Sequence, residues 1–493
     1  MESERGENPR RKLLKRCDDA DVSGDDQAIL VDRISHLPEA ILCHILSFLP
    51  TKSAVATSFL SKSWDRRWTK VTNFDFKDLP WRRWRTTGTE SSLSANPGGG
   101  VPKMDFVGFV NMVLLNQSRE NSINRFRLQI KNRPFVNFSF IFLNIWVTTA
   151  VTRNVRVLDL DLSPHLPLHD DSDDDYHDSE FHLPDALYNC GTLEVLKLEG
   201  AFLIKPPSMV SLPKLTDLEL LSVKFDSDES FSRLISGCRM IHSLVMSRDH
   251  CNDGMTVCTI SSPVLKLLQY SQDFCQKCDM QAEHHLQLKI DTPALQRLTL
   301  FDFLTEVIVR GLTSLDEVNL EIPYIQPEKT VRLIQAFDYV NSLALYDSTM
   351  RIVSKAINTL SSSFDKLTKL AARVECCQFS HLMSLIDRCA TLKSLQIGKC
   401  RVLCPHHDKS LGDPPRRIPK CFLSSLTHVS FLDFEGHENE MALLRFIADH
   451  ASRLTTLNVR RREGYVVPEE KMHLLEQRLS SSAVSPTCAI SIS

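Results

Sequence analysis

The sequence predicts an α/β fold in three parts: a small three-helix module, an irregular leucine-rich-repeat solenoid of parallel strands and short helices, and an α/β segment that caps the solenoid. Three observations lead to this prediction. Apolar residues between positions 37 and 49 recur at helical spacing. From residue 123 onward, a motif of alternating leucines returns at intervals of roughly 20–30 residues. The last part of the chain alternates between strand-like and helix-like patterns.

The bulk composition is that of a globular protein with no general affinity for nucleic acid or membranes. The 493 residues exceed what one compact core holds, which favours several domains or one elongated repeat array. With 58 basic and 61 acidic residues, the net charge of −3 provides no global basic field, so we predict no nucleic-acid partner. The longest apolar stretch, Phe138–Val151, is too short to span a bilayer, so we predict no membrane partner.

The charged start of the chain and its cysteines predict an intracellular site of action. No apolar signal-peptide core is present near Met1, so we expect the chain in the nucleus and/or the cytoplasm. The 15 cysteines are odd in number and scattered through apolar segments. They are therefore expected to be reduced and mostly buried thiols.

Three polar segments are predicted to lie outside the folded parts. Residues 1–28 form a disordered tail, whose basic cluster Arg10–Arg16 is either a solvated stretch or a nuclear-import signal. Residues 86–103, rich in Thr, Ser, Gly and Pro, form a flexible insertion. The acidic run Asp170–Asp175 is read as a solvent-exposed loop, with recognition or cation binding as alternatives. It lacks the alternating ligands and turn glycine of a calcium loop.

The helical module occupies residues 29–72. Pro38 can stand in the first turn of a helix that Pro50 ends, and Thr51 can cap a second helix. Ser61 can cap a third helix, which would place Trp64 and Trp68 on one side. So short a module, with so much apolar surface, is marginal alone. We therefore expect it to dock on a partner or on the adjoining solenoid.

The solenoid is predicted over residues 123–411. Each Leu-x-x-Leu-x-Leu copy is a strand with one buried face, and stacked copies share a core that no single copy can form. Segments between strands, such as Asp228–Cys238 and Glu328–Tyr339, have the spacing of short convex helices. The copies are Val155–Leu160, Leu193–Leu198, Leu215–Leu220, Ile241–Met246, Leu295–Leu300, Leu315–Leu320, Val340–Leu345, Leu392–Ile397 and Leu454–Val459, with weaker members at Val264–Leu268 and Leu367–Leu370.

The C-terminal segment, residues 412–493, has the pattern strand, helix, strand, helix. Val429, Phe431 and Phe434 lie in the first strand, and the helices are expected at Glu438–Ala451 and Pro468–Ser480. An exposed end of a repeat array needs a cap with a polar outer face. This segment is predicted to supply it.

Two of these parts carry a family resemblance. Asp32–Lys52, with its Leu37-Pro38 start and its Ser-Phe-Leu-Pro break, and the later Leu60–Trp64 closely resemble a plant-type F-box domain. Ser63 departs from the basic residue usual before that tryptophan. Pro419–Leu426 and the segment after it resemble the FBD domain. The whole chain thus resembles the plant F-box/leucine-rich-repeat/FBD-domain protein family.

The resemblance implies a substrate receptor of a ubiquitin ligase. The F-box would bind a Skp-type adaptor and through it a cullin, while the solenoid would recruit a target protein of unknown identity. The chain itself would be non-catalytic, with no cofactor. For each matching position, an intramolecular core role and an adaptor-contact role remain open. These positions are Leu37, Pro38, Ile41, Leu42, Ile45, Leu49, Val55, Leu60 and Trp64.

Outward-facing strand residues are the candidates for target contact. Alternatives to the receptor role are a non-degradative F-box scaffold, a receptor that needs a small molecule in the repeat pocket, and an unrelated enzyme. No nucleophile elbow, phosphate-binding loop or zincin motif supports the last. The candidate contact residues are Asp159, Lys197, Glu219, Arg297 and Asn319.

Two cysteine–histidine groups invite a zinc interpretation that their spacing does not favour. Cys275 and Cys278 are followed by His284 and His285 too closely for the usual structural zinc sites. The second group is Cys400, Cys404, His406 and His407. We predict no metal at either.

Overall fold

The structure is a computed structural model of the chain. It describes residues 34–78, 105–118, 121–131, 140–163, 180–248, 254–272, 286–301, 306–322, 325–360, 362–374, 379–399, 417–465, 467–480 and 488–493. The predicted tail 1–28, insertion 86–103 and acidic run 170–175 lie outside these ranges, as do both cysteine–histidine groups and the predicted boundary at 411/412.

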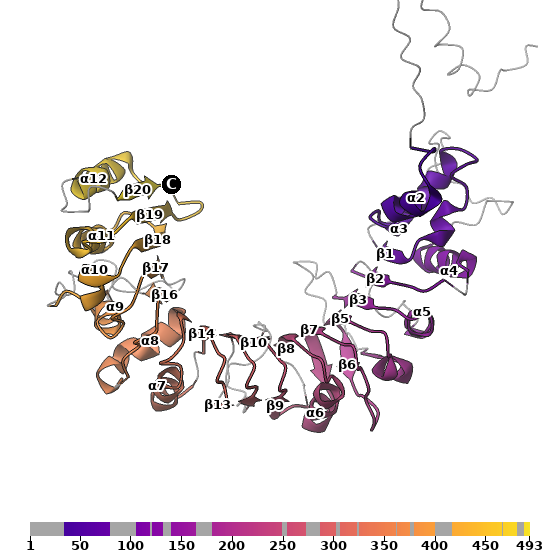
Figure 1. Cartoon of the computed structure of the whole chain (residues 1–493), viewed down its shortest axis with the longest axis horizontal. Helices are drawn as coiled ribbons and strands as arrows, with labels where there is room; N and C mark the ends of the chain where they lie inside the picture. Colours follow the sequence, from indigo (N-terminus) through magenta and orange to yellow (C-terminus); the bar gives the residue numbers. More distant parts are fainter. Residues whose placement is uncertain are drawn as a thin grey trace, which may run out of the picture.

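The described strands form a 17-stranded sheet that curves into an arc, with strands along the concave side and helices outside them (Figure 1). Neighbouring strands pair in parallel and follow chain order; β4 (Phe181–His182) pairs with β6 (Phe202–Ile204), which pairs with the end of β7. The others are β1 (Asn73–Lys77), β2 (Arg125–Gln129), β3 (Val157–Leu162), β5 (Val195–Gly200), β7 (Asp217–Phe225), β8 (Ser243–Arg248), β10 (Leu267–Gln272), β12 (Arg297–Phe301), β14 (Glu317–Glu321), β15 (Ser342–Leu345), β16 (Lys369–Val374), β17 (Ser394–Lys399), β18 (His428–Phe434), β19 (Thr456–Arg461) and β20 (Ala489–Ile492).

Every predicted repeat copy supplies one strand of this sheet, including the two weaker ones. The leucines come into register across the strands: Leu158 faces Leu196, which faces Leu218. All three are at most 2% exposed. Each repeat thus buries its leucines only against its neighbours, which explains why the motif must recur.

The convex layer is only partly helical. Helix α6 (Asp228–Gly237) matches the prediction and is capped by the Ser227 hydroxyl, which accepts from the Ser230 N–H; α7 (Pro327–Gln335) also matches. Between them lies a parallel three-stranded sheet instead of helices. Two of its three strands bury alternate apolar residues with the period of two that a strand requires, and the apolar residues of the third are half-buried. They are β9 (Val257–Ser261), β11 (Gln287–Asp291) and β13 (Glu306–Arg310).

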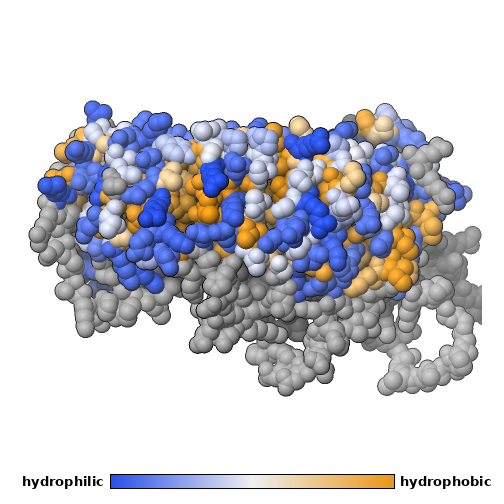
Figure 2. All heavy atoms as spheres, turned by 90° about the horizontal axis from the view of Figure 1, so that it is seen from below, coloured by the Kyte–Doolittle hydropathy of each residue, from blue (hydrophilic) through white to orange (hydrophobic). Residues whose placement is uncertain are grey.

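The convex face is mixed in polarity. Figure 2 views it directly and shows hydrophobic residues through its middle, between hydrophilic margins. On β13, Val307, Ile308 and Val309 are half-buried, and Val307 and Val309 pack against the core. The remaining convex helices of the array are α5 (Phe140–Thr152), α8 (Asp347–Lys355) and α9 (Phe379–Ile386).

The tight stacking of strands gives one glycine substitution a clear expected effect. Gly200 has φ +95°, and a Cβ there would lie 2.6 Å from the backbone carbonyl carbon of Leu162. Gly200→Ala should therefore lower the free energy of unfolding by at least about 2 kcal/mol. At Gly191, which has nothing within 4 Å of a Cβ, the same change should be nearly neutral. Chemical denaturation of the two variants checks this, and equal stabilities would contradict it.

The N-terminal module differs from its predicted helices in detail. Helix α2 (Glu39–Leu46) begins after Pro38 and ends four residues before Pro50, and Pro50 precedes α3 (Thr51–Ala56). The predicted helix from Ser61 is wrong: the Ser61 hydroxyl hydrogen-bonds the Ser63 hydroxyl (2.7 Å) rather than capping a helix.

A turn replaces that third helix. Arg66 has φ +59°, which α-helical backbone does not allow, and only a 3₁₀ helix, η2 (Arg67–Lys70), follows. Another 3₁₀ helix, η1 (Thr57–Phe59), extends α3. Trp64 and Trp68 are nonetheless both buried, at 8% exposed each.

The sheet begins earlier than predicted. Strand β1, at Asn73–Lys77, lies directly after the helical module and pairs with β2 over its full length. Its buried residues are Phe74 and Phe76 rather than leucines. Helix α4 (Phe106–Asn116) follows, with the Asp105 carboxylate accepting from the Gly108 N–H at 2.7 Å.

The C-terminal segment prolongs the same sheet. The predicted strand–helix–strand–helix order is confirmed as β18, α11 (Glu438–His450), β19 and α12 (Glu469–Ser480), preceded by the short α10 (Lys420–Ser424). Strand β18 pairs with the repeat strand β17, and β19 pairs with β20. The segment therefore ends the array by adding strands to it.

The described cysteines fit the prediction of reduced thiols. All seven are free, and five of them are buried: Cys190, Cys238, Cys258, Cys389 and Cys421. Burial raises the pKa of Cys238 and of Cys421 to about 12, so these thiols stay protonated at neutral pH. Within the described ranges, no helix has the length and hydrophobicity needed to cross a membrane.

Candidate functional site

The helical module has its own small core, which merges with the first strands. Leu42, Leu46 and Ala54 are at most 2% exposed and belong to the same cluster as Val71 and Phe74 of the chain that follows. Two polar contacts orient the tryptophan beside them. The Trp64 indole N–H donates to the Ser35 hydroxyl at 2.8 Å, and the Arg67 guanidinium lies 5.2 Å from the Trp64 ring centroid.

Hydrogen bonds fix the module on the end of the sheet. The buried Thr51 hydroxyl accepts from the backbone N–H of Asp75 on β1 at 2.8 Å. The side-chain amide of Gln117, next to α4, donates to the backbone carbonyl of Trp68 at 3.1 Å. One face of the module is thus anchored to the solenoid.

The opposite face is apolar and exposed, and we call it the docking face. On α2, Ile41 and Ile45 lie one turn apart and are 47% and 41% exposed, whereas Leu42 and Leu46 next to them are buried. Exposed apolar residues of this density mark interaction sites in soluble proteins. The docking face comprises Leu37, Ile41, Ile45, Phe48, Leu49, Phe59 and Leu60, which are 36–78% exposed.

The structure divides the nine predicted adaptor-binding residues into buried and exposed positions. Leu42 and Trp64 belong to the core, and Val55 is half-buried against it. The other predicted positions are exposed: Leu37, Pro38, Ile41, Ile45, Leu49 and Leu60. Phe48 and Phe59, at 74% and 78% exposed, are missing from the predicted set. A large aromatic residue just before Leu49-Pro50 and another just before Leu60 were the available signals.

One ion pair, between Lys70 and Glu39, lies on the module that carries the docking face. Lys70 donates to the Glu39 carboxylate at 2.7 Å, and this hydrogen bond, with the attraction of the two charges, holds the pKa of Glu39 below its ordinary value. Burial raises the pKa of the nearby Cys43 thiol. The docking face therefore offers apolar contact more than charge.

On the concave face, three of the candidate target-contact residues pair with neighbouring strands. Asp159, Lys197 and Glu219 lie side by side on β3, β5 and β7. The Arg127 guanidinium contacts Asp159 at 3.2 Å, and Lys197 forms an ion pair with Glu219. Burial raises the pKa of Asp159, because it outweighs the opposing effect of Arg127 and Arg125. These charges are largely satisfied within the sheet.

On the strands after β7, the residues in register with Asp159, Lys197 and Glu219 carry no charge; we call residues in register across the strands a row. The row passes through Asn319, whose amide donates to the Thr299 hydroxyl and to Glu317, both at 3.2 Å. Arg297, on the adjacent row, is exposed. In register after Glu219 come Val245, Gln269, Thr299, Asn319, Ala344, Ala371, Gln396, Ser430, Asn458 and Ser491.

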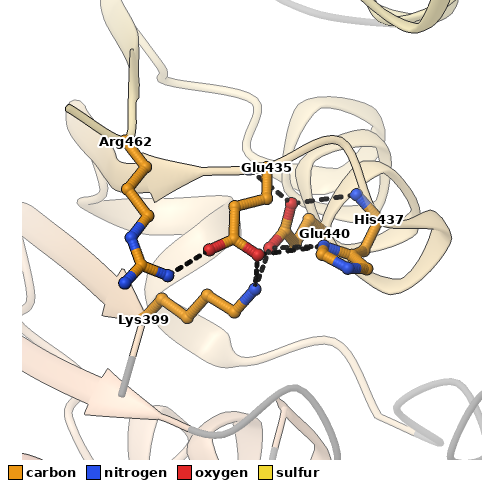
Figure 3. Close-up of polar contacts among 5 residues, drawn as sticks. All are labelled: Lys399, Glu435, His437, Glu440 and Arg462. Carbon is orange, nitrogen blue, oxygen red and sulfur yellow. Dashed lines mark hydrogen bonds and ion pairs between the residues drawn. The ribbon is translucent and has the colours of Figure 1, made fainter. Parts of the chain in front are cut away.

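A buried polar network joins the last repeat strand to the C-terminal segment (Figure 3). Lys399, at the end of β17, pairs with Glu435, while the Arg462 guanidinium contacts the other Glu435 oxygen at 2.5 Å. Glu440, 2% exposed, accepts from the backbone N–H groups of Glu435 and His437 at 3.0 Å each, at the start of α11. The network therefore ties three neighbouring loops together.

Glu435, His437 and Glu440 have potential metal-ligand atoms within 4.8 Å of one another. The Lys399 ammonium, however, already pairs with Glu435 and lies 3.6 Å from Glu440. A lysine and an arginine balance the two carboxylates, so the charge that a metal would supply is already present (Figure 3). We interpret the network as structural.

The network predicts an acid-dependent contribution to stability. Burial raises the pKa of Glu435, but hydrogen bonds from Lys399 and Arg462 outweigh it and leave the pKa below its ordinary value of 4.5. The stabilisation is thus full above that ordinary value and is lost as the pH falls through the lower folded-state pKa. Glu435→Gln should be less stable than wild type at pH 7 and approach it on acidification. Urea midpoints across this range test it; a pH-independent difference would contradict it.

Comparisons with known proteins match all three parts of the chain. A family model for the F-box domain matches residues 34–75, and one for the FBD matches residues 413–459. A model described as "FBD-associated F-box protein At5g56370, LRR repeats" matches residues 143–309. The matched segments include the docking-face module, the repeats from β3 to β12, strand β18 and the start of β19.

Relatives in Arabidopsis thaliana match almost end to end. F-box/FBD/LRR-repeat protein At1g78750 is 25% identical over 478 residues, covering 94% of this chain and 96% of that protein. FBD-associated F-box protein At4g10400 is 27% identical, covering 94% and 100%. F-box/FBD/LRR-repeat protein At5g56420 is 28% identical, covering 93% and 98%. The protein belongs to the plant F-box/leucine-rich-repeat/FBD family.

Proposed function

We propose that the protein is the substrate receptor of a Skp–cullin–F-box ubiquitin ligase and acts in the nucleus or the cytoplasm. An F-box domain in general implies a Skp-type adaptor. The docking face is the observation that carries the proposal here. Its apolar residues stay exposed although the module is already anchored to the sheet through Thr51 and Gln117.

In this role the chain contributes geometry rather than chemistry. The F-box would hold the adaptor at one end of the arc, and the adaptor would connect to the cullin and the charged conjugating enzyme. A target on the concave face would then be held near the ubiquitin thioester, which raises its effective concentration for transfer. F-box, repeat and FBD domains are typical interaction modules, and we propose no catalytic residue in this chain.

A reconstitution with purified proteins tests the proposal. The full chain, a Skp-type adaptor, a cullin–RING pair and a conjugating enzyme should form one complex on size exclusion. In this complex, ubiquitin transfer should occur to lysines on the receptor or on a captured target. A complex without the cullin would refute the ligase role. An intact complex that transfers no ubiquitin would instead support a non-degradative scaffold.

A further inference from the structure

The two halves of the concave face differ in how their charges are satisfied. In the first half, cations and carboxylates pair across neighbouring strands: besides the pairs of Asp159 and Lys197, the Lys131 ammonium contacts Asp161 at 3.0 Å. Such a surface has little charge left for a partner. Binding there would break existing pairs and would have to replace them.

The second half, from β12 to β19, presents unpaired cations. Arg297, Lys369 and Arg460 are exposed and occupy outward positions of their strands by alternation. Within the described part of the chain, no carboxylate forms an ion pair with any of these three. His428 is also exposed on the same row as Lys369, one strand beyond Ser394. The acidic residues of these strands are Glu317 and Glu321 on β14 and the half-buried Asp433 on β18, and Glu317 lies in register beside Arg297.

One further cation in this half is held in place. The Arg373 guanidinium lies 5.5 Å from the centroid of the Tyr346 ring, and one of its nitrogens lies 4.0 Å from the Asp347 carboxylate. On its other side is Gly398, where a Cβ would come within 3.1 Å of the Arg373 Cγ. The Tyr346 ring is itself in T-shaped contact with the Phe301 ring, with the two ring centroids 5.4 Å apart. A side chain fixed in this way loses little entropy when it binds an anion.

The concave strand residues between these cations are uncharged, and most of them are small. Ala344, Ala371 and Gln396 lie in register on β15, β16 and β17, and Gly398 follows on β17. Small side chains let a partner chain approach the sheet closely, so that its own side chains reach the cations on both margins. Charge complementarity then determines which kind of segment fits.

We propose that the concave face from β12 to β19 binds an acidic segment of the target protein, with carboxylates on Lys369, Arg373 and Arg460. The inference rests on the proposed receptor function, because it names the chemistry of the target. The first half of the arc, where Asp159, Asp161 and Lys197 pair with opposite charges on neighbouring side chains, is not part of this site. Arg373 is the anchor, because its guanidinium has five N–H donors and can bind a target carboxylate while its 4.0 Å contact with Asp347 remains. Lys369 and Arg460 flank it.

A displayed library of random 12-residue peptides, selected on the purified full chain bound to its adaptor, tests this inference. Selected peptides should be enriched in Asp and Glu, and their affinity should fall as salt rises from 0.05 to 0.5 M. Lys369→Glu with Arg460→Glu should weaken a selected peptide at least about tenfold. The convex reversals Lys289→Glu with Arg310→Glu should leave its affinity unchanged.

A second variant distinguishes the specific contribution of the Arg373 guanidinium from a general effect of positive charge. Arg373→Lys keeps the charge but loses the planar guanidinium, and should weaken the selected peptide several-fold. Neutral or basic selected peptides, failure to select any, or equal loss in the convex control would overturn the inference. Adaptor binding is measured on the same preparations. Loss of adaptor binding would contradict the proposed function. Retained adaptor binding together with failed peptide selection would contradict only the proposed target site.

Discussion

The double substitution Ile41→Glu and Ile45→Glu is expected to weaken binding of a Skp-type adaptor by at least about 100-fold. Both residues are exposed on the docking face, while the adjacent Leu42 and Leu46 of α2 are buried, hold the fold and remain unchanged. The variant places two carboxylates where a dry apolar contact is proposed, and their desolvation opposes binding. Isothermal titration of purified adaptor into the full chain measures the effect.

The chain offers a matched control for this experiment. Ile141 and Ile145 on α5 are also one turn apart and are 69% and 51% exposed, but they lie outside the docking face. Ile141→Glu with Ile145→Glu should leave adaptor affinity within about twofold of wild type. Unchanged binding by the α2 variant, or an equal loss in the α5 variant, would show that the docking face is not the adaptor site.

The second large effect is expected at the network of Figure 3. Lys399→Met removes the cation between Glu435 and Glu440, which are 6% and 2% exposed, and leaves excess negative charge buried. Breaking a buried ion pair from one side typically costs about 3–5 kcal/mol. Because a repeat array can unfold in parts, the loss should appear first as faster hydrogen exchange in β18 and α11.

Lys393→Met is the control for this change. Lys393 lies just before β17 and is exposed, so its removal should alter stability by no more than about 0.5 kcal/mol. Hydrogen exchange and urea unfolding on both variants give the comparison. If Lys399→Met unfolds like wild type, the network does not hold the C-terminal segment on the repeats.

The repeat strands were predictable because their signal is local and repeated. Leu196, Leu218 and Leu244 stand at one position of one motif, and stacking brings them into register. Strand β1 escaped prediction because its buried residues are Phe74 and Phe76, and about fifty residues separate it from the predicted start of the solenoid. The convex strands β9, β11 and β13 lack the leucine motif, and short alternating runs do not show which layer they join.

The sequence predicts the residues of the docking face only together with the core residues of the same helical module, without telling the two apart. Ile41, Leu42 and Ile45 all fall on one apolar stripe by spacing, and spacing cannot show which edge of the stripe meets the solenoid. The fold decides it: α2 packs against η2, so Leu42 is buried in the core while Ile41 and Ile45 stay exposed. The prediction of a third helix was wrong for a related reason. Ser61 has a side chain that can cap a helix, but its hydroxyl hydrogen-bonds the Ser63 hydroxyl instead.

Hydrogen–deuterium exchange of the full chain with and without the adaptor tests the central claim most directly. Adaptor binding should slow exchange in residues 37–60, which contain the docking face, and leave strands β12 to β19 unchanged. Protection confined to those F-box residues is the result that the proposed function predicts. Adaptor binding without protection there, or with protection on the concave strands instead, would contradict it.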